Sequence, residues 1–166
     1  MSYLVRKFSE KAWPDGEERL FESVQSLNAD CITNGLNTNQ NTLSWWYIND
    51  LVELESMAVS IASVFQSKGR IFVVAIPFND VKEKKIKAVL SEEDAETAVI
   101  PFKKRHFNLE NLTYSQLGVL AELVAINSQI PTNRKTLSFN KIKESIEQSI
   151  QQGDIDKNLL GSIFRK

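Results

Sequence analysis

A short apolar segment places the strongest constraint on the fold of this chain. Residues 71–76 read Ile-Phe-Val-Val-Ala-Ile, with no polar residue among them and Pro77 directly after them. Side chains of a β-strand alternate between the two faces of its sheet, so a strand without polar positions has to be covered on both faces. The segment therefore predicts an interior strand of a sheet that has other elements packed on both sides.

Two adjacent tryptophans, Trp45 and Trp46, are followed by Tyr47 within residues 42–48, a stretch rich in strand-forming residues. Neighbouring side chains on a strand point to opposite faces, so the two tryptophans cannot enter the same core. One interpretation is core packing on both faces of the sheet. The other is an aromatic surface left for a partner, because tryptophan and tyrosine often dominate the binding energy of protein interfaces.

Further strands and helices follow from local signals. Asp50 and Ser138 are suitable N-caps, Thr113 and Gln116 have capping-box spacing, and Gly153 is suited to a helix end. We expect strands at residues 3–8, 29–33 and 99–102, and helices at residues 17–27, 51–66, 113–127, 138–152 and from residue 156 onward.

Strands that come first and helices that come later predict an α+β protein. We expect a small, mostly antiparallel sheet from the N-terminal half, packed by helices, and a helical C-terminal part. In domain terms, residues 1–110 form the sheet-containing core and residues 111–166 a helical part packed on the same domain. The helix before residues 71–76 also permits a single right-handed crossover between parallel strands.

An asparagine-rich segment, residues 34–41, separates two of the predicted strands. Its first dipeptide, Asn34-Gly35, is a strong turn signal and predicts a hairpin loop. Asn37 and Asn39 then belong either to a solvated loop or to a binding loop beside the aromatic run.

Composition limits the cellular setting. The chain of 166 residues has one cysteine, Cys31, which excludes an intramolecular disulfide and gives no sign of an oxidising compartment. No apolar stretch approaches the roughly 18 residues of a membrane span, and the first residues lack the pattern of a signal peptide. We expect a cytoplasmic protein without a membrane partner.

Residues suited to catalysis are scarce. His106 is the only histidine, and we interpret it as a surface residue of a basic loop; we interpret Cys31 as a small buried residue of a strand. The chain has no phosphate-binding loop and no zinc-ligand spacing, so we expect neither a cofactor nor a metal. A small hydrolase or transferase using Asp30 and His106 remains an alternative, which requires the two side chains within hydrogen-bond reach of each other or of a shared pocket.

Charge is divided unevenly along the chain. Residues 1–102 contain 10 Lys/Arg and 15 Asp/Glu, a net charge of −5, whereas residues 103–166 contain 10 Lys/Arg and 6 Asp/Glu, a net charge of +4. Basic regions hold phosphates in nucleic-acid complexes, so nucleic-acid binding is a second alternative if the cations converge on one face. The residues concerned are Lys103, Lys104, Arg105, His106, Arg134, Lys135 and Lys141.

The leading hypothesis is a non-enzymatic protein-interaction module, an accessory or regulatory subunit of a bacterial-type cytoplasmic assembly. It rests on the scarcity of catalytic residues, the aromatic run and the divided charge. The partner is another protein or a second copy of the chain. The residues expected to bind it are Trp45, Trp46, Tyr47, Asn37 and Asn39.

Overall fold

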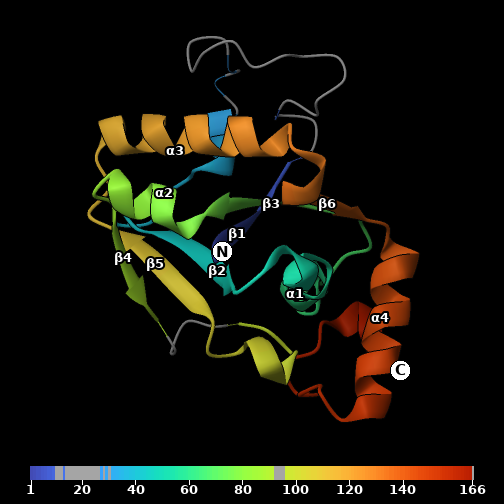
Figure 1. The fold of residues 1–166 in the computed structure, drawn as a ribbon. Coiled ribbons are helices and arrows are strands. Elements are labelled where there is room, and N and C mark those ends of the chain that lie inside the picture. Colours follow the sequence, from blue (N-terminus) through green and yellow to red (C-terminus); the bar gives the residue numbers. More distant parts are fainter. Residues whose placement is uncertain (10–12, 14–26, 28, 30, 92–95, 166) are drawn as a thin grey trace.

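A six-stranded antiparallel sheet forms the centre of the molecule (Figure 1). The computed structural model describes residues 1–9, 13, 27, 29, 31–91 and 96–165, so the helix expected at residues 17–27 lies outside the described residues. The strand order is β4-β5-β2-β1-β3-β6, and all neighbours are antiparallel. The strands are β1 (Tyr3–Phe8), β2 (Leu43–Ile48), β3 (Ile71–Pro77), β4 (Lys87–Leu90), β5 (His106–Glu110) and β6 (Arg134–Leu137).

The apolar segment is an interior strand, as predicted. β3 lies between β1 and β6, and every residue from Ile71 to Ile76 is buried. Phe72, Val74 and Ile76 enter the core on one face, which we call the first face, whereas Val73 and Ala75 enter the core on the second face. A strand with two dry faces has no position for a polar side chain, which explains its composition.

Helices cover both faces of the sheet (Figure 1). On the first face, α2 (Phe78–Glu83) and α3 (Tyr114–Ser128) contribute Phe78, Val81, Leu120 and Val124 to the core. On the second face, α1 (Leu54–Ala62) and α4 (Phe139–Gln152) contribute Leu54, Met57, Ile142 and Ile146. The α+β fold with helices in its C-terminal part is therefore confirmed.

The predicted helix boundaries hold where a side chain caps the backbone. The hydroxyl of Thr113 accepts a hydrogen bond from the backbone N–H of Gln116 in a complete capping box, and Ser138 accepts from the N–H of Lys141. Asp50 accepts from the N–H of Val52 and begins a 3-10 turn that leads into α1. Gly153 ends α4 with φ 82°, a conformation that glycine adopts without a steric penalty.

The connection through α1 is a crossover. β2 and β3 both run antiparallel to β1, which lies between them, so β2 and β3 are parallel to each other and α1 joins them. The crossover therefore connects two parallel strands, β2 and β3, that are separated in the sheet by β1.

The predictions of a strand at residues 29–33 and of a hairpin loop after it are wrong. Residues Cys31–Gly35 form a π-helix, and the tight turn lies further on, where Gln40 and Asn41 adopt φ values of 50° and 58°. Gly35 has a packing role instead, because a Cβ atom there would lie 2.8 Å from Nε1 of Trp13. The asparagines predicted the presence of a turn but not its position.

Three predictions near the C-terminus also need correction. The expected strand at residues 99–102 is a 3-10 turn over Ile100–Phe102, and the expected last helix is a 3-10 turn over Ser162–Phe164. Between the helices α3 and α4, where no strand was expected, β6 pairs with β3. None of the helices in the described part of the chain has the length and apolarity that a bilayer crossing requires.

Candidate functional site

The two tryptophans of β2 have different environments. Trp45 is fully buried in the core of the first face, where its ring centroid lies 6.0 Å from that of Phe8. Trp46 points to the second face, stays partly exposed, and lies with its ring centroid 5.2 Å from that of His106. Only Trp46 of this pair therefore has surface that a partner can reach.

The other residues proposed for partner binding do not form one patch with Trp46. Tyr47 is on the first face, where its ring packs against Phe78 and Phe107. Asn37 and Asn39 are exposed, and Asn39 flanks the turn that precedes β2.

The interpretation of His106 as a surface residue is wrong. His106 is the first residue of β5, pairs with Trp46 of β2, and is only 3% exposed. Basic neighbours suggested a loop, but the sheet inserts this segment between β2 and β4. Asp30, the proposed catalytic companion of His106, lies outside the described residues.

Four of the basic side chains proposed for nucleic-acid binding are paired with carboxylates. Lys103 Nζ lies 2.6 Å from Asp156 Oδ2, and Arg105 contacts Glu53 at 2.7 Å. Lys135 and Lys141 both contact Glu55, at 2.7 and 3.8 Å. The three carboxylates offset three of these four positive charges, which weakens the attraction for phosphates.

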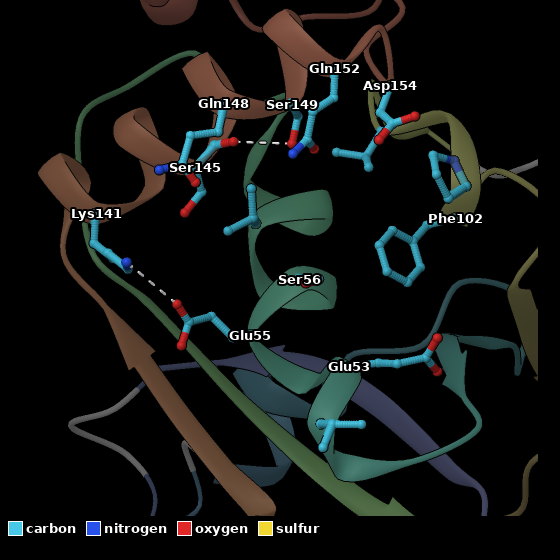
Figure 2. A pocket seen from close by; sticks show the side chains of 14 residues that line it. Glu53, Glu55, Ser56, Phe102, Lys141, Ser145, Gln148, Ser149, Gln152 and Asp154 are labelled. Carbon is cyan, nitrogen blue, oxygen red and sulfur yellow. Dashed lines mark hydrogen bonds and ion pairs between the residues drawn. The ribbon is translucent and has the colours of Figure 1, made fainter.

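Two of these carboxylates, Glu53 and Glu55, line a groove of about 590 Å³ between α1, α4 and the turn Ile100–Phe102 (Figure 2). This volume falls in the range of ligand-binding clefts, roughly 300–1,000 Å³. Figure 2 shows Lys141 and Glu55 at one end of the groove and Phe102 with Asp154 at the other.

The two walls of the groove differ in chemistry. On the α4 wall, Lys141 is followed by an uncharged polar stripe of Ser145, Gln148, Ser149 and Gln152, whose spacing places them on one side of the helix. The remaining lining combines carboxylates with apolar side chains: Glu53, Glu55, Asp154, Val52, Val59, Val99 and Phe102.

Two of the three groove carboxylates have depressed pKa values. Partial burial raises the pKa of Glu53, but hydrogen bonds from the Arg105 side chain and the Asn49 backbone outweigh it and lower the pKa overall. The pKa of Glu55 is lowered chiefly by its hydrogen bond with Lys135, aided by Lys141. Both carboxylates are therefore held in the charged form.

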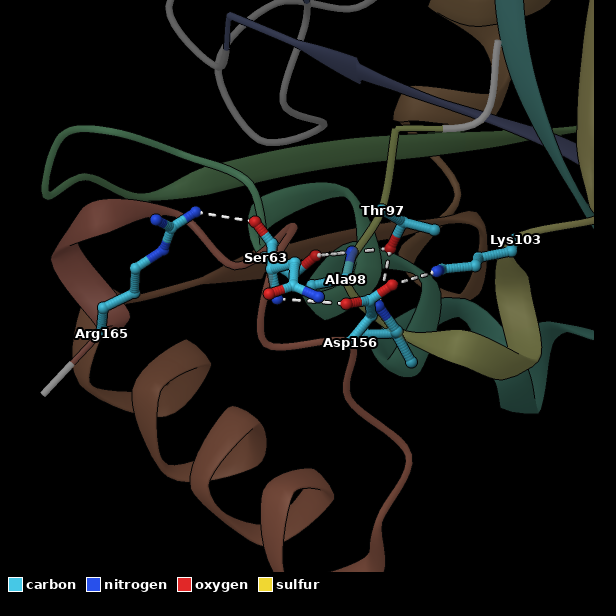
Figure 3. A network of polar contacts seen from close by, with 8 residues as sticks. Ser63, Thr97, Ala98, Lys103, Asp156 and Arg165 are labelled. Carbon is cyan, nitrogen blue, oxygen red and sulfur yellow. Dashed lines mark hydrogen bonds and ion pairs between the residues drawn. The ribbon is translucent and has the colours of Figure 1, made fainter. Parts of the chain in front are cut away.

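A buried hydroxyl network fixes the rim of the groove (Figure 3). The Thr97 and Ser60 hydroxyls are 2.7 Å apart, and Thr97 also donates to the Ser60 carbonyl at 3.0 Å. The Ser63 hydroxyl accepts from the backbone N–H of Ala98 at 2.9 Å. Since Val99 and the turn Ile100–Phe102 follow directly, this network ties the rim to α1.

Apart from Lys141, which was predicted for nucleic-acid binding, the groove residues were not among the sites predicted from the sequence. A usable signal exists, because uncharged polar residues recur at positions 145, 148, 149 and 152 beside the apolar face of α4. Such a stripe also occurs on any solvated helix, so only the facing α1 and the 3-10 turn identify it as a groove wall. Over the described residues, no three His, Cys, Asp or Glu side chains gather in a way that would hold a metal ion.

Comparison of the chain with protein-family models, with curated proteins and with solved structures finds no match.

Proposed function

We propose that this protein is a non-enzymatic protein-interaction module, an accessory or regulatory subunit that binds a segment of a partner protein in the groove between α1 and α4. The observation that carries the proposal is the groove itself, about 590 Å³ with one wall of amide and hydroxyl side chains. Such side chains both donate and accept hydrogen bonds, which matches the exposed backbone of a peptide.

The charged residues around the groove support binding over catalysis. Glu53 is held by Arg105 and the Asn49 backbone, and Glu55 by two lysines. A carboxylate held in the charged form cannot serve as a general acid, which needs a raised pKa, and its pairing with a cation occupies the oxygens that a general base or nucleophile would use. The apolar lining residues Val59, Val99 and Phe102 are buried in the core and give the groove a fixed wall, whereas Val52 is exposed and offers a ligand apolar surface.

Nucleic-acid binding by the basic C-terminal residues is the weaker alternative. It requires cations that are available to phosphates, and Lys103, Arg105, Lys135 and Lys141 each contact a carboxylate. Trp46 remains a second docking residue for a protein partner, because part of its ring is exposed on the second face.

The test is affinity capture of the tagged full-length protein from its native cells, with and without nuclease. Ser56 is exposed and lines the groove, so Ser56→Trp should fill it and abolish the capture of a stoichiometric protein partner. Ser115→Trp, at an exposed position of α3 on the other side of the sheet, is the matched control and should retain the partner.

Two results would contradict the proposal. Equal capture by wild type and Ser56→Trp would remove the groove as the docking site. Material that disappears with nuclease and elutes with salt would favour the nucleic-acid alternative.

A further inference from the structure

Asp154 occupies an electrostatically unfavourable position at one end of the groove. It is the second residue after the last residue of α4, a helix of 14 residues, and its side chain lines the groove. The C-terminal end of a helix carries partial negative charge, so a carboxylate there is repelled. Because this carboxylate lowers the stability of the helix end, a role in binding would explain its presence there.

The carboxylate of Asp154 is the groove charge that no described side chain neutralises. Glu53 pairs with Arg105, and Glu55 pairs with Lys135 and Lys141. Asp156, two residues further on, pairs with Lys103. Over the described residues, no ion pair or side-chain hydrogen bond joins Asp154 to another group, which leaves its negative charge available to a ligand.

The backbone of Asp154 is held in place even though its side chain is not. Its N–H donates to the Ser149 carbonyl at 2.9 Å, and its carbonyl accepts from the Ile100 N–H at 2.8 Å. These two bonds fix the residue between the end of α4 and the 3-10 turn at the rim. The backbone of Asp154 is therefore fixed at the end of the groove, so that binding a ligand there does not require the chain to become ordered.

The polar stripe of α4 sets the length of ligand that the groove can align. Ser145 to Gln152 span seven helical steps, roughly 10 Å at 1.5 Å per residue. An extended peptide advances roughly 3.3 Å per residue, so the stripe faces about three residues of such a chain. Its amides and hydroxyls suit peptide groups, and Asp154 lies at the end of the stripe.

We infer that the groove takes an extended segment of a partner protein that places an arginine or lysine side chain against Asp154. This inference rests on the proposed function and adds the chemistry of the partner. The positive charge of the basic side chain would offset both the negative charge of the Asp154 carboxylate and the partial negative charge at the C-terminal end of α4. The backbone of the segment lies along the α4 stripe.

The experiment uses the full-length protein and fluorescein-labelled pentapeptide mixtures. The central residue is fixed as arginine, lysine, norleucine or glutamate, and the other positions are randomised over uncharged residues. Fluorescence anisotropy gives the affinity of each mixture. We expect arginine- or lysine-centred peptides to bind about five- to tenfold more tightly than norleucine-centred peptides, the range of a single charge-assisted contact.

Asp154→Asn should abolish this preference while the fold is kept. Because the substitution removes a charge that the helix end repels, the variant should unfold at the same denaturant concentration as wild type or a higher one. Glu144→Gln is the control, because it also removes one negative charge. Glu144 is exposed on α4 and does not line the groove. The control variant should keep the preference.

Three outcomes in which peptides bind would overturn the inference. They are saturable binding without a preference for basic peptides, a preference that survives in Asp154→Asn, and an equal loss of preference in Glu144→Gln. Absence of binding by every mixture at millimolar concentration would also overturn it. If Ser56→Trp nevertheless prevents partner capture from cells, the proposed function stands and only the basic-segment chemistry fails.

Discussion

Trp45 and Trp46 are adjacent in the chain but have different physical roles, because the alternation of β2 sends them to opposite faces. Trp45 fills the core of the first face, and Trp46 covers His106 at the edge of the second core. The indole N–H of Trp45 is buried and has no hydrogen-bond partner among the described residues. Its contribution is therefore one of volume and apolar area.

This contrast predicts unequal costs of substitution. Trp45→Ala should lower the free energy of unfolding by about 3–5 kcal/mol, the range for a buried tryptophan, and Trp46→Ala by about 1–2 kcal/mol because its ring keeps part of its hydration. Trp45→Phe should cost less than Trp45→Ala, since it keeps a ring and leaves no hydrogen bond broken. Urea unfolding followed by circular dichroism measures all three, and similar losses for both alanine variants would contradict the burial seen here.

Among the secondary-structure elements, α1, α4 and β6 are connected by the ion pairs of Glu55. Glu55 lies in α1 and contacts Lys135 of β6 at 2.7 Å and Lys141 of α4 at 3.8 Å. All of these side chains are exposed by more than a third, so solvent screens the ion pairs and each contributes little alone. Together they connect the first turns of α1 and α4 with β6, and the contact between Lys141 and Glu55 bounds this end of the groove.

The lowered pKa of Glu55 gives a pH dependence of known sign. A carboxyl group with a depressed folded-state pKa adds stability that is present above its unfolded-state pKa and is lost as the pH falls through the folded-state value. Between pH 6 and pH 3, Glu55→Gln should therefore lose less stability than wild type, by about 0.5 kcal/mol for such exposed pairs. Urea titrations at both pH values test this, with Glu144→Gln as the control. An identical pH dependence in wild type and Glu55→Gln would show that the pair contributes nothing.

At the scale of the whole molecule, the sheet integrates distant parts of the chain. β1 lies at its centre, and β6, from the C-terminal part, pairs with β3. Residues on α4 and near the C-terminus, among them Ile142, Ile146 and Phe164, complete the core of the second face. A chain that ends at residue 110 would leave β3 with an open edge and this core uncovered.

We therefore expect the full chain to unfold in one cooperative transition, and a fragment of residues 1–110 not to fold. Circular dichroism, and fluorescence of the tryptophans, which lie on both faces, should report coincident urea transitions for the full chain. The fragment should show no cooperative transition. Two separated transitions, or a folded fragment, would indicate that the two parts are independent.

The sequence by itself determined the interior strand and the capped helices. Residues 71–76 admit only a strand with two covered faces, and the caps at Thr113 and Ser138 satisfy backbone groups within one turn. These features depend on residues close together in the chain, so local chemistry is enough to specify them. The α+β class followed from their order.

Only the tertiary structure decided the short strands, the burial of His106 and the groove. β5 and β6 have few apolar residues and are strands because β2 and β3 offer them backbone partners. The π-helix Cys31–Gly35 stands where a strand was expected, and its last residue, Gly35, packs closely against Trp13 and Phe8. The groove exists because α1, α4 and the turn Ile100–Phe102 meet there, and contacts between residues so far apart in the chain leave no local pattern in the sequence.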